Sequence, residues 1–394
     1  YKQSFSSIIS AITHKTQNIT KNRLEPLFSS ETVFADWKQQ QKILSIPQKN
    51  IEDTKTPISI FLGIDSGSTT TKVVFLNEQA ELIAQHYGTN NGNPIQAAIQ
   101  GIEACAKHIG TEQITILRSA VTGYGEDLLH AAFNIDDGIV ETIAHTTAAQ
   151  KINPDVSFIL DIGGQDMKAI FIKNGAIQSI EINEACSSGC GSFIQNFAQT
   201  LSYSAQDFGT LACSAQNPCD LGSRCTVFMN SQVKQSLKEG AEISEIAAGL
   251  AYSVIKNALN KVLQIKDMNV LGNAIMVQGG TFKNPSVFRA MEVITQKPIY
   301  TTNFPELMGA LGAAYYSYEI WTKNPTDSCC ISYENRYNAL EYDSRQITCK
   351  GCNNNCIVTK FTFNKDNIHY SGNKCEKVFS SKGQYKERGE NIYE

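Results

Sequence analysis

The feature that most constrains the fold is a pattern that occurs twice along the chain. Residues 58–65 read as a buried strand that runs into a turn of Gly, Ser and Thr, and two more strands and a helical segment, 94–109, follow. Residues 156–161 read as a second buried strand, which also runs into a Gly-rich acidic turn before two strands and several helices. Strands followed by helices predict α/β units, and the repetition predicts two related halves with a cleft between them.

Changes in composition along the chain set the expected domain boundaries. A chain of 394 residues has room for about two to three domains. We expect residues 1–57 to form a polar extension and linker, 58–150 the first half and 151–322 the second. A last helix is expected at about 305–321 and should return towards the first half. Residues 323–394 are expected to form a small cysteine-bearing appendage or the start of a further domain.

Charge and hydropathy exclude several classes of function. Lys plus Arg number 34 and Asp plus Glu number 38, for a net charge of −4, so a nucleic-acid scaffold, which needs clustered basic residues, is not expected. No apolar run approaches the ~18 residues of a membrane span, and the N-terminus lacks the apolar core of a signal peptide. We therefore expect a cytoplasmic protein that binds neither nucleic acid nor membrane. In that reducing setting, twelve cysteines point to metal or redox work.

The first acidic turn has the composition of a phosphate-binding loop. Asp65 is a candidate for holding hydrated Mg²⁺, an ion that proteins bind with few carboxylates plus phosphates. Glycine allows a ligand to approach the backbone, while successive N–H groups and hydroxyls can bind phosphate oxygens. A plain Gly/Ser hairpin turn would also fit this segment taken alone. The candidate nucleotide contacts here are Gly67, Ser68, Thr69, Thr70 and Lys72.

Two later turns strengthen the nucleotide hypothesis. The turn Asp161-Ile162-Gly163-Gly164-Gln165-Asp166 offers a second carboxylate and two glycines. Asp161 can hold metal or act as a base, and Gln165 can orient an attacking water. The turn Gln278-Gly279-Gly280 follows another buried strand and suits packing against a base or ribose.

Three such turns in this order resemble the superfamily of actin, sugar kinases and heat-shock ATPases. The resemblance implies an α/β, two-lobed ATPase fold with duplicated ribonuclease-H-like halves. It also implies that the two aspartate turns face each other across the nucleotide, with the double glycine near the adenosine.

Two cysteines lie where helices are expected to begin, between the second and third turns. Cys186 precedes a Ser-Ser-Gly-Cys stretch, and Cys225 stands in Arg224-Cys225-Thr226. The partial positive charge at a helix N-terminus stabilises a thiolate, the form that binds metal. Two thiolates are half of a four-cysteine iron–sulfur site, and a symmetric dimer would supply the other half. A pair of buried structural cysteines is the alternative.

With these segments the chain resembles the ATP-dependent activators of 2-hydroxyacyl-CoA dehydratases, the BadF/BadG/BcrA/BcrD-type ATPases, which are related to the ATPase subunits of benzoyl-CoA reductase. The matching segments occur in family order over about residues 60–320. They are 63–72, 122–125, 141–145, 161–168, 183–193, 224–228 and 278–280.

The resemblance implies an ATPase coupled to electron transfer. It implies ATP and Mg²⁺ as cofactors, and a homodimer or paired homologous domain that shares one 4Fe-4S cluster. Cys186 and Cys225 of each protomer would be the ligands. Hydrolysis would drive a low-potential electron into a partner 2-hydroxyacyl-CoA dehydratase or related reductase, with ferredoxin or flavodoxin as donor. Because the extensions resemble those of long fused members, we expect this chain to be a fragment of a fused activase.

Three further cysteines depart from the family pattern. Cys190 stands where the family usually has Thr or another small residue, so it is a competing ligand candidate. Cys213 and Cys219 lie in the insertion before Cys225 and are interpreted as incidental.

The tail carries a separate cysteine motif. A Cys-x2-Cys turn with two further cysteines is a reasonable four-thiolate site, and zinc and a second iron–sulfur cluster both fit. Reduced, unligated cysteines are the alternative, and the pair Cys329-Cys330 is not expected to take part. The candidate ligands are Cys349, Cys352, Cys356 and Cys375.

Two other functions remain open at this point. A kinase of the same superfamily would phosphorylate a sugar or another small metabolite, and would need an Asp base but no paired thiolates. A nucleotide-gated sensor or scaffold would need neither. An iron–sulfur cluster in the purified protein would separate the activator from both.

Overall fold

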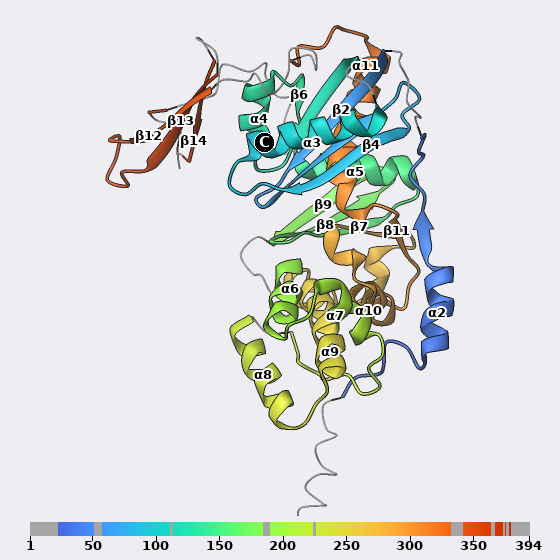
Figure 1. Ribbon diagram of the computed structural model, residues 1–394. Helices are drawn as coiled ribbons and strands as arrows, with labels where there is room; N and C mark the ends of the chain where they lie inside the picture. Colours follow the sequence, from blue (N-terminus) through green and yellow to red (C-terminus); the bar gives the residue numbers. More distant parts are fainter. Residues whose placement is uncertain are drawn as a thin grey trace, which may run out of the picture. The chain divides into compact units, whose positions relative to one another are not determined.

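The computed structural model describes residues 23–50, 57–110, 113–183, 190–223, 226–331, 342–363, 367–372, 375 and 378–379 (Figure 1). The chain divides into two compact units. The first comprises residues 1–45 and 153–306, and the second comprises residues 46–152 and 307–394.

The second unit is built on a five-stranded sheet in the order β4-β3-β2-β5-β6. Strand β2 pairs antiparallel with β3, and β3 with β4, whereas β5 lies parallel to β2 on its other side. Helix α3 packs on β3 and β4, and α11 packs on β2 and α5. The elements are β2 Ile58–Ser66, β3 Thr70–Leu76, β4 Leu82–Thr89, α3 Pro94–Ile109, β5 Ile114–Thr122, α4 Glu126–Phe133, β6 Asp137–Gly138, α5 Glu141–Ile152 and α11 Met308–Lys323.

The first unit is built on a six-stranded sheet in the order β1-β11-β10-β7-β8-β9. Helices α7, α9 and α10 pack on one another beside it. The elements are α2 Glu31–Gln40, β1 Lys42–Leu44, β7 Phe158–Ile162, β8 Met167–Lys173, β9 Ala176–Asn183, α6 Gly191–Thr200, α7 Ala205–Ala212, α8 Thr226–Lys238, α9 Ile243–Lys256, a π-helical turn Asn257–Val262, β10 Ile275–Gln278, α10 Pro285–Thr295 and β11 Ile299–Thr302. Short 3-10 turns span Met268–Leu271, Gly280–Lys283 and Pro305–Leu307.

The two sheets share one topology. In each, the first strand (β2 or β7) begins an antiparallel meander of three strands. On the other side of that first strand lies a parallel strand, β5 or β10, and a further parallel strand lies beyond it. The predicted duplication of an α/β unit is therefore confirmed.

Helix α3 shows how local sequence determines these elements. The Asn93 side chain accepts a hydrogen bond from the N–H of Gln96, Pro94 opens the first turn, and Gly110 ends the helix in a left-handed conformation. These are the residue types that favour each position. Its apolar residues recur at helical spacing and are all buried: Ile95, Ala98, Ile99, Ile102 and Ala106.

Part of the N-terminal extension joins the first unit. Strand β1 lies parallel to β11 at the edge of the six-stranded sheet, which the sequence did not predict because three residues are too few to show a periodicity. Trp37 of α2 lies edge-on to Phe288, and its indole N–H donates to Glu292 at 2.7 Å.

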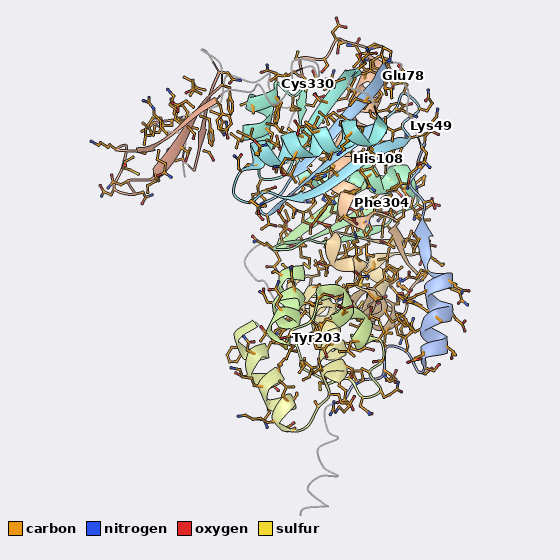
Figure 2. The ribbon with its side chains drawn as sticks, in the orientation of Figure 1. Lys49, Glu78, His108, Tyr203, Phe304 and Cys330 are labelled. Atoms are coloured by element: carbon orange, nitrogen blue, oxygen red, sulfur yellow. The ribbon has the colours of Figure 1, made fainter. Side chains whose placement is uncertain are left out.

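The tail forms a three-stranded antiparallel sheet, β12 Tyr342–Thr348, β13 Ile357–Phe363 and β14 Asn367–Ser371. Phe363 is buried in the core of the second unit, and the Asn367 amide donates to the carbonyl of Ala131 at 2.6 Å. Cys330 packs against the same core (Figure 2). No helix in the part of the chain that the structure describes is both long and apolar enough to span a bilayer.

The packing of α11 on α5 gives a first prediction. A methyl group at Gly312 would stand 1.8 Å from the carbonyl oxygen of Ala144, a backbone atom that cannot move aside. Gly312→Ala should therefore lower the free energy of unfolding by at least about 2 kcal/mol, the cost of overpacking a core. Ser317→Ala, in the same helix, is the control, because it removes a buried hydroxyl that has no hydrogen-bond partner. Denaturant unfolding of both variants checks this, and equal stability would contradict it.

Candidate functional site

Asp65 is the centre of the first acidic turn. It stands one residue before the end of β2, opposite Lys72 of β3, and the Lys72 ammonium lies 3.0 Å from Asp65 Oδ2. The other carboxylate oxygen, Oδ1, is buried and has no hydrogen-bond partner. A buried carboxylate oxygen without a hydrogen-bond partner lowers the stability of the folded chain by about 1–3 kcal/mol or more. This oxygen is therefore suited to a cation or to metal-bound water.

The turn after Asp65 is braced by a residue that the sequence did not single out. The Asn90 amide donates to the carbonyl of Gly67 at 2.7 Å, and its carbonyl oxygen accepts from the Thr71 hydroxyl at 2.5 Å. The backbone N–H of Asn90 also donates to Thr69 at 2.9 Å. With these bonds in place, the predicted contact residues Ser68 and Thr69 are exposed at the tip of the turn.

Two glycines bring other segments against Asp65. Gly123 has a φ of +88°, and a methyl group there would stand 3.0 Å from Asp65 Oδ1. A methyl group at Gly309, in the first turn of α11, would stand 2.6 Å from Asp65 Oδ2 and 3.2 Å from Nε2 of His145. The carboxylate is thus enclosed by backbone, and a buried histidine lies nearby.

His145 and Glu141 are functional candidates to which the sequence reasoning gave no role. Both lie on α5, and Nε2 of His145 is 3.7 Å from a carboxylate oxygen of Glu141. Residues spaced i,i+4 lie on one face of a helix, so the sequence alone indicates that these two side chains are neighbours. The position of His145 near Asp65 depends on the packing of α11, which the sequence spacing does not reveal.

The second acidic turn occupies the same position in the other sheet. Asp161 stands one residue before the end of β7, opposite Lys168 of β8, and it is buried. Here the lysine pairs with Asp166, whose backbone carbonyl accepts from the N–H of Gly163 at 3.0 Å. Gln165 is exposed at the tip of this turn, beside Gly164.

The third turn lies directly beside the second. Gln278 of β10 is opposite Asp161 of β7. Gly279 has a φ of +89°, and a methyl group there would stand 2.3 Å from the carbonyl oxygen of Ile162 and 2.7 Å from Asp161 Oδ1. A methyl group at Gly280 would stand 4.0 Å from Cβ of Glu306, an ordinary van der Waals contact. The structure therefore brings together two of the three predicted turns within one unit.

Helix α6 is hydrogen-bonded to the second turn. The backbone N–H groups of Gly191 and Ser192 donate to the carbonyls of Gly163 and Gly164, both at 2.9 Å. The hydroxyl of Thr281, just after the third turn, also donates to Gly163 at 3.2 Å. The start of α6 is thus held against the second turn by backbone hydrogen bonds.

The cysteines of the first unit have different environments. Cys186 and Cys225 lie outside the described residues, although α8 begins at Thr226, directly after Cys225, as expected. Cys190 is the buried N-cap residue of α6. Burial raises the pKa of Cys213 to about 12 and also raises the pKa of Cys219. In both cases burial favours the protonated thiol over the thiolate that a metal needs.

The tail thiols lie at one end of the three-stranded sheet. Cys349 is buried, Cys356 is half-buried, and Cys352 and Cys375 are exposed. Among the described residues, no three of these sulfur atoms lie within 4.8 Å of one another.

The sequence of this chain is similar to a known family of ATPases and to activators of CoA dehydratases. The profile of the BadF/BadG/BcrA/BcrD ATPase family matches residues 62–317. The 2-hydroxyisocaproyl-CoA dehydratase activator of Clostridioides difficile is 32% identical over 262 residues, which cover 66% of this chain and 94% of that protein. The (R)-2-hydroxyglutaryl-CoA dehydratase activating ATPase of Acidaminococcus fermentans is 31% identical over 264 residues, covering 66% and 96%.

Solved structures of similar proteins have the same fold. Component A of the Acidaminococcus fermentans (R)-2-hydroxyglutaryl-CoA dehydratase matches with a TM-score of 0.59 and 29% identity, over 67% of this chain and 99% of that one. The activator of the 2-hydroxyisocaproyl-CoA dehydratase from Clostridium difficile with bound ADPNP matches with a TM-score of 0.58 and 29% identity, over 67% and 96%.

Proposed function

This chain belongs to the BadF/BadG/BcrA/BcrD ATPase family, and from that membership we propose that it uses ATP hydrolysis to drive a low-potential electron into a partner 2-hydroxyacyl-CoA dehydratase or related reductase. Relatives over 30% identical are named as activators of such dehydratases, one of them as an activating ATPase. The observation that carries the proposal is the duplicated acidic turn, with Asp65 and Asp161 at the same position in two sheets of one topology.

The first turn is proposed to bind the phosphates. The hydroxyls of Ser68, Thr69 and Thr70 and the backbone N–H groups of this turn can donate to phosphate oxygens. Asp65 would hold Mg²⁺ through its buried Oδ1, an assignment that the lack of another partner for this atom supports. Held by Asp65, Mg²⁺ would supply positive charge that offsets the negative charge of the phosphates.

The second and third turns are proposed to supply the chemistry and the nucleoside contacts. Asp161 would act as a base or second metal ligand, and the Gln165 amide would orient the attacking water. Gly163 and Gly164 allow the phosphates close approach. Gln278, Gly279 and Gly280 would pack against the nucleoside.

The proposed electron site rests on the cysteine pair. Cys186 and Cys225 of each protomer would ligate one 4Fe-4S cluster shared across a homodimer or paired homologous domain. The start of α8 directly after Cys225 fits this role, since a helix N-terminus favours the thiolate. Bound there, the cluster supplies a one-electron donor that ferredoxin or flavodoxin can reduce. The bonds from Gly191 and Ser192 to the second turn support coupling between nucleotide state and the Cys186 segment.

One anaerobic experiment tests the proposal. The reduced protein is mixed with a 2-hydroxyacyl-CoA dehydratase, and dehydration and phosphate release are followed together. Dehydration should require ATP and should fail with ADPNP, while phosphate release should need no added metabolite. Consumption of ATP only with a sugar or other small metabolite, yielding its phosphorylated form, would establish the kinase instead.

The role of Gln165 gives a second prediction. Gln165→Ala should lower ATP turnover by about 10- to 100-fold, because the attacking water is no longer oriented. ATP affinity should stay almost unchanged, since the amide acts in the transition state. Gln178→Ala, an exposed glutamine on β9, is the matched control. Steady-state kinetics with separate ATP titration checks both, and a loss of affinity with normal turnover would show that Gln165 binds nucleotide.

A further inference from the structure

Three of the four candidate ligand cysteines in the tail lie on the connection between β12 and β13. The two strands pair up to Thr348 opposite Ile357. Just beyond that pair, the backbone N–H of Cys349 donates to the carbonyl of Cys356 at 2.8 Å. The connection is therefore a closed loop that begins at Cys349 and ends at Cys356, with Cys352 between them.

The fourth cysteine is brought to the same end of the sheet by the register. Strand β14 runs antiparallel to β13, with Ser371 opposite Thr359, and so runs towards the closed loop. Cys375 follows four residues later, within a reach of about 13 Å. Val378 lies against the same loop, because a methyl group at Gly351 would stand 2.3 Å from its side chain.

This sheet has little core of its own. Val358, Phe363 and His369 are its buried side chains on β13 and β14 among the described residues, and nearly all of β12 is exposed or half-buried. Sheets this small usually need added stabilisation, which a structural metal can provide. Four thiols gathered at one end of such a sheet are well placed for that role.

We propose that Cys349, Cys352, Cys356 and Cys375 bind one structural Zn²⁺ ion. The spacings Cys349-x2-Cys352 and Cys352-x3-Cys356 both fall within the range common in zinc sites. Zn²⁺ has no redox chemistry, so it suits thiols that stand at an exposed end of a sheet. This proposal is independent of the activator function.

The distances between the thiols predict that metal binding brings the closed loop and Cys375 closer together. Four ligands at the usual Zn–S length stand about 3.8 Å apart in a tetrahedron, whereas no three of the described sulfurs lie within 4.8 Å of one another. Zn²⁺ must therefore draw the closed loop and the segment at Cys375 together. Binding free energy then becomes folding free energy for the tail.

The test uses the full chain carrying Cys186→Ala and Cys225→Ala, so that iron at the proposed cluster is not counted. Metal analysis of this protein, purified anaerobically, should find about one zinc per chain. Adding Cys352→Ser or Cys375→Ser should remove most of that zinc. Adding Cys329→Ser, an exposed cysteine outside the set, should leave it in place. Retention of zinc in both ligand variants, or no zinc in the parent, would overturn the proposal.

A second measurement does not depend on how the variants fold. The chelator-treated parent chain is titrated with Co²⁺, and thiolate-to-cobalt absorption should saturate at one equivalent and be displaced by Zn²⁺. Protease cleavage within 342–379 should slow as Zn²⁺ is added. Iron with equimolar sulfide in the parent, lost on Cys352→Ser, would instead establish a second cluster and overturn the zinc assignment.

Discussion

Asp65→Asn and Asp161→Asn should each lower ATP turnover by at least about 100-fold. Asparagine keeps the size of the side chain but removes the charge that holds a metal or accepts a proton. For Asp65 the change also leaves Lys72, 3.0 Å from Oδ2, without its carboxylate partner. Phosphate release at saturating ATP and Mg²⁺ measures the effect.

The control for these variants is Glu78→Gln, which removes one carboxylate from the exposed hairpin between β3 and β4 (Figure 2). Its turnover should match that of the unmodified chain. Thermal unfolding of all three variants shows whether the fold is retained. Near-normal turnover in both aspartate variants would remove the assignment of these turns to the nucleotide, and with it the basis for both the activator and the kinase hypotheses.

Local sequence patterns predicted the parts of this fold that depend on local physics. A continuous apolar run predicts the strand that ends at Asp65, and a helical period predicts the helix 94–109. Both are present with nearly the predicted bounds. Apolar residues at helical spacing predict one helix over about 242–265, but in the structure α9 ends at Lys256 and a π-helical turn follows at Asn257–Val262. Its apolar spacing continues through that turn, so periodicity alone does not reveal the change.

The candidate site was predictable where glycines and carboxylates follow a strand, and not where packing brings in distant residues. Asn90 braces the first turn from 23 residues away, and His145 reaches the neighbourhood of Asp65 because Gly309 of α11 has no side chain. Such contacts depend on how helices and strands pack against one another in the folded chain. No local pattern in a single sequence indicates which residues from distant segments will meet.

Cys186→Ala or Cys225→Ala should abolish the iron and sulfide of the anaerobic protein and weaken its dimer. Two thiolates per chain cannot complete a four-cysteine site, so the cluster should require two chains or two homologous domains, with about four irons per pair. Loss of a ligand then also removes a contact across the interface. ATP turnover should survive in part, because the phosphate turns lie elsewhere in the sequence.

Two other cysteines provide matched controls for that experiment. Cys213→Ala should leave the iron content unchanged, because burial raises the pKa of this thiol to about 12 and keeps it protonated. Cys190→Ala should also retain the cluster if Cys186 is the ligand, although Cys190 is the N-cap residue of α6. Iron, sulfide and sedimentation measurements on each variant, repeated on a chain truncated after Lys323, separate this site from the tail. If the reconstituted truncated chain stays colourless and monomeric, the electron-transfer proposal loses its central support and the kinase becomes the better hypothesis.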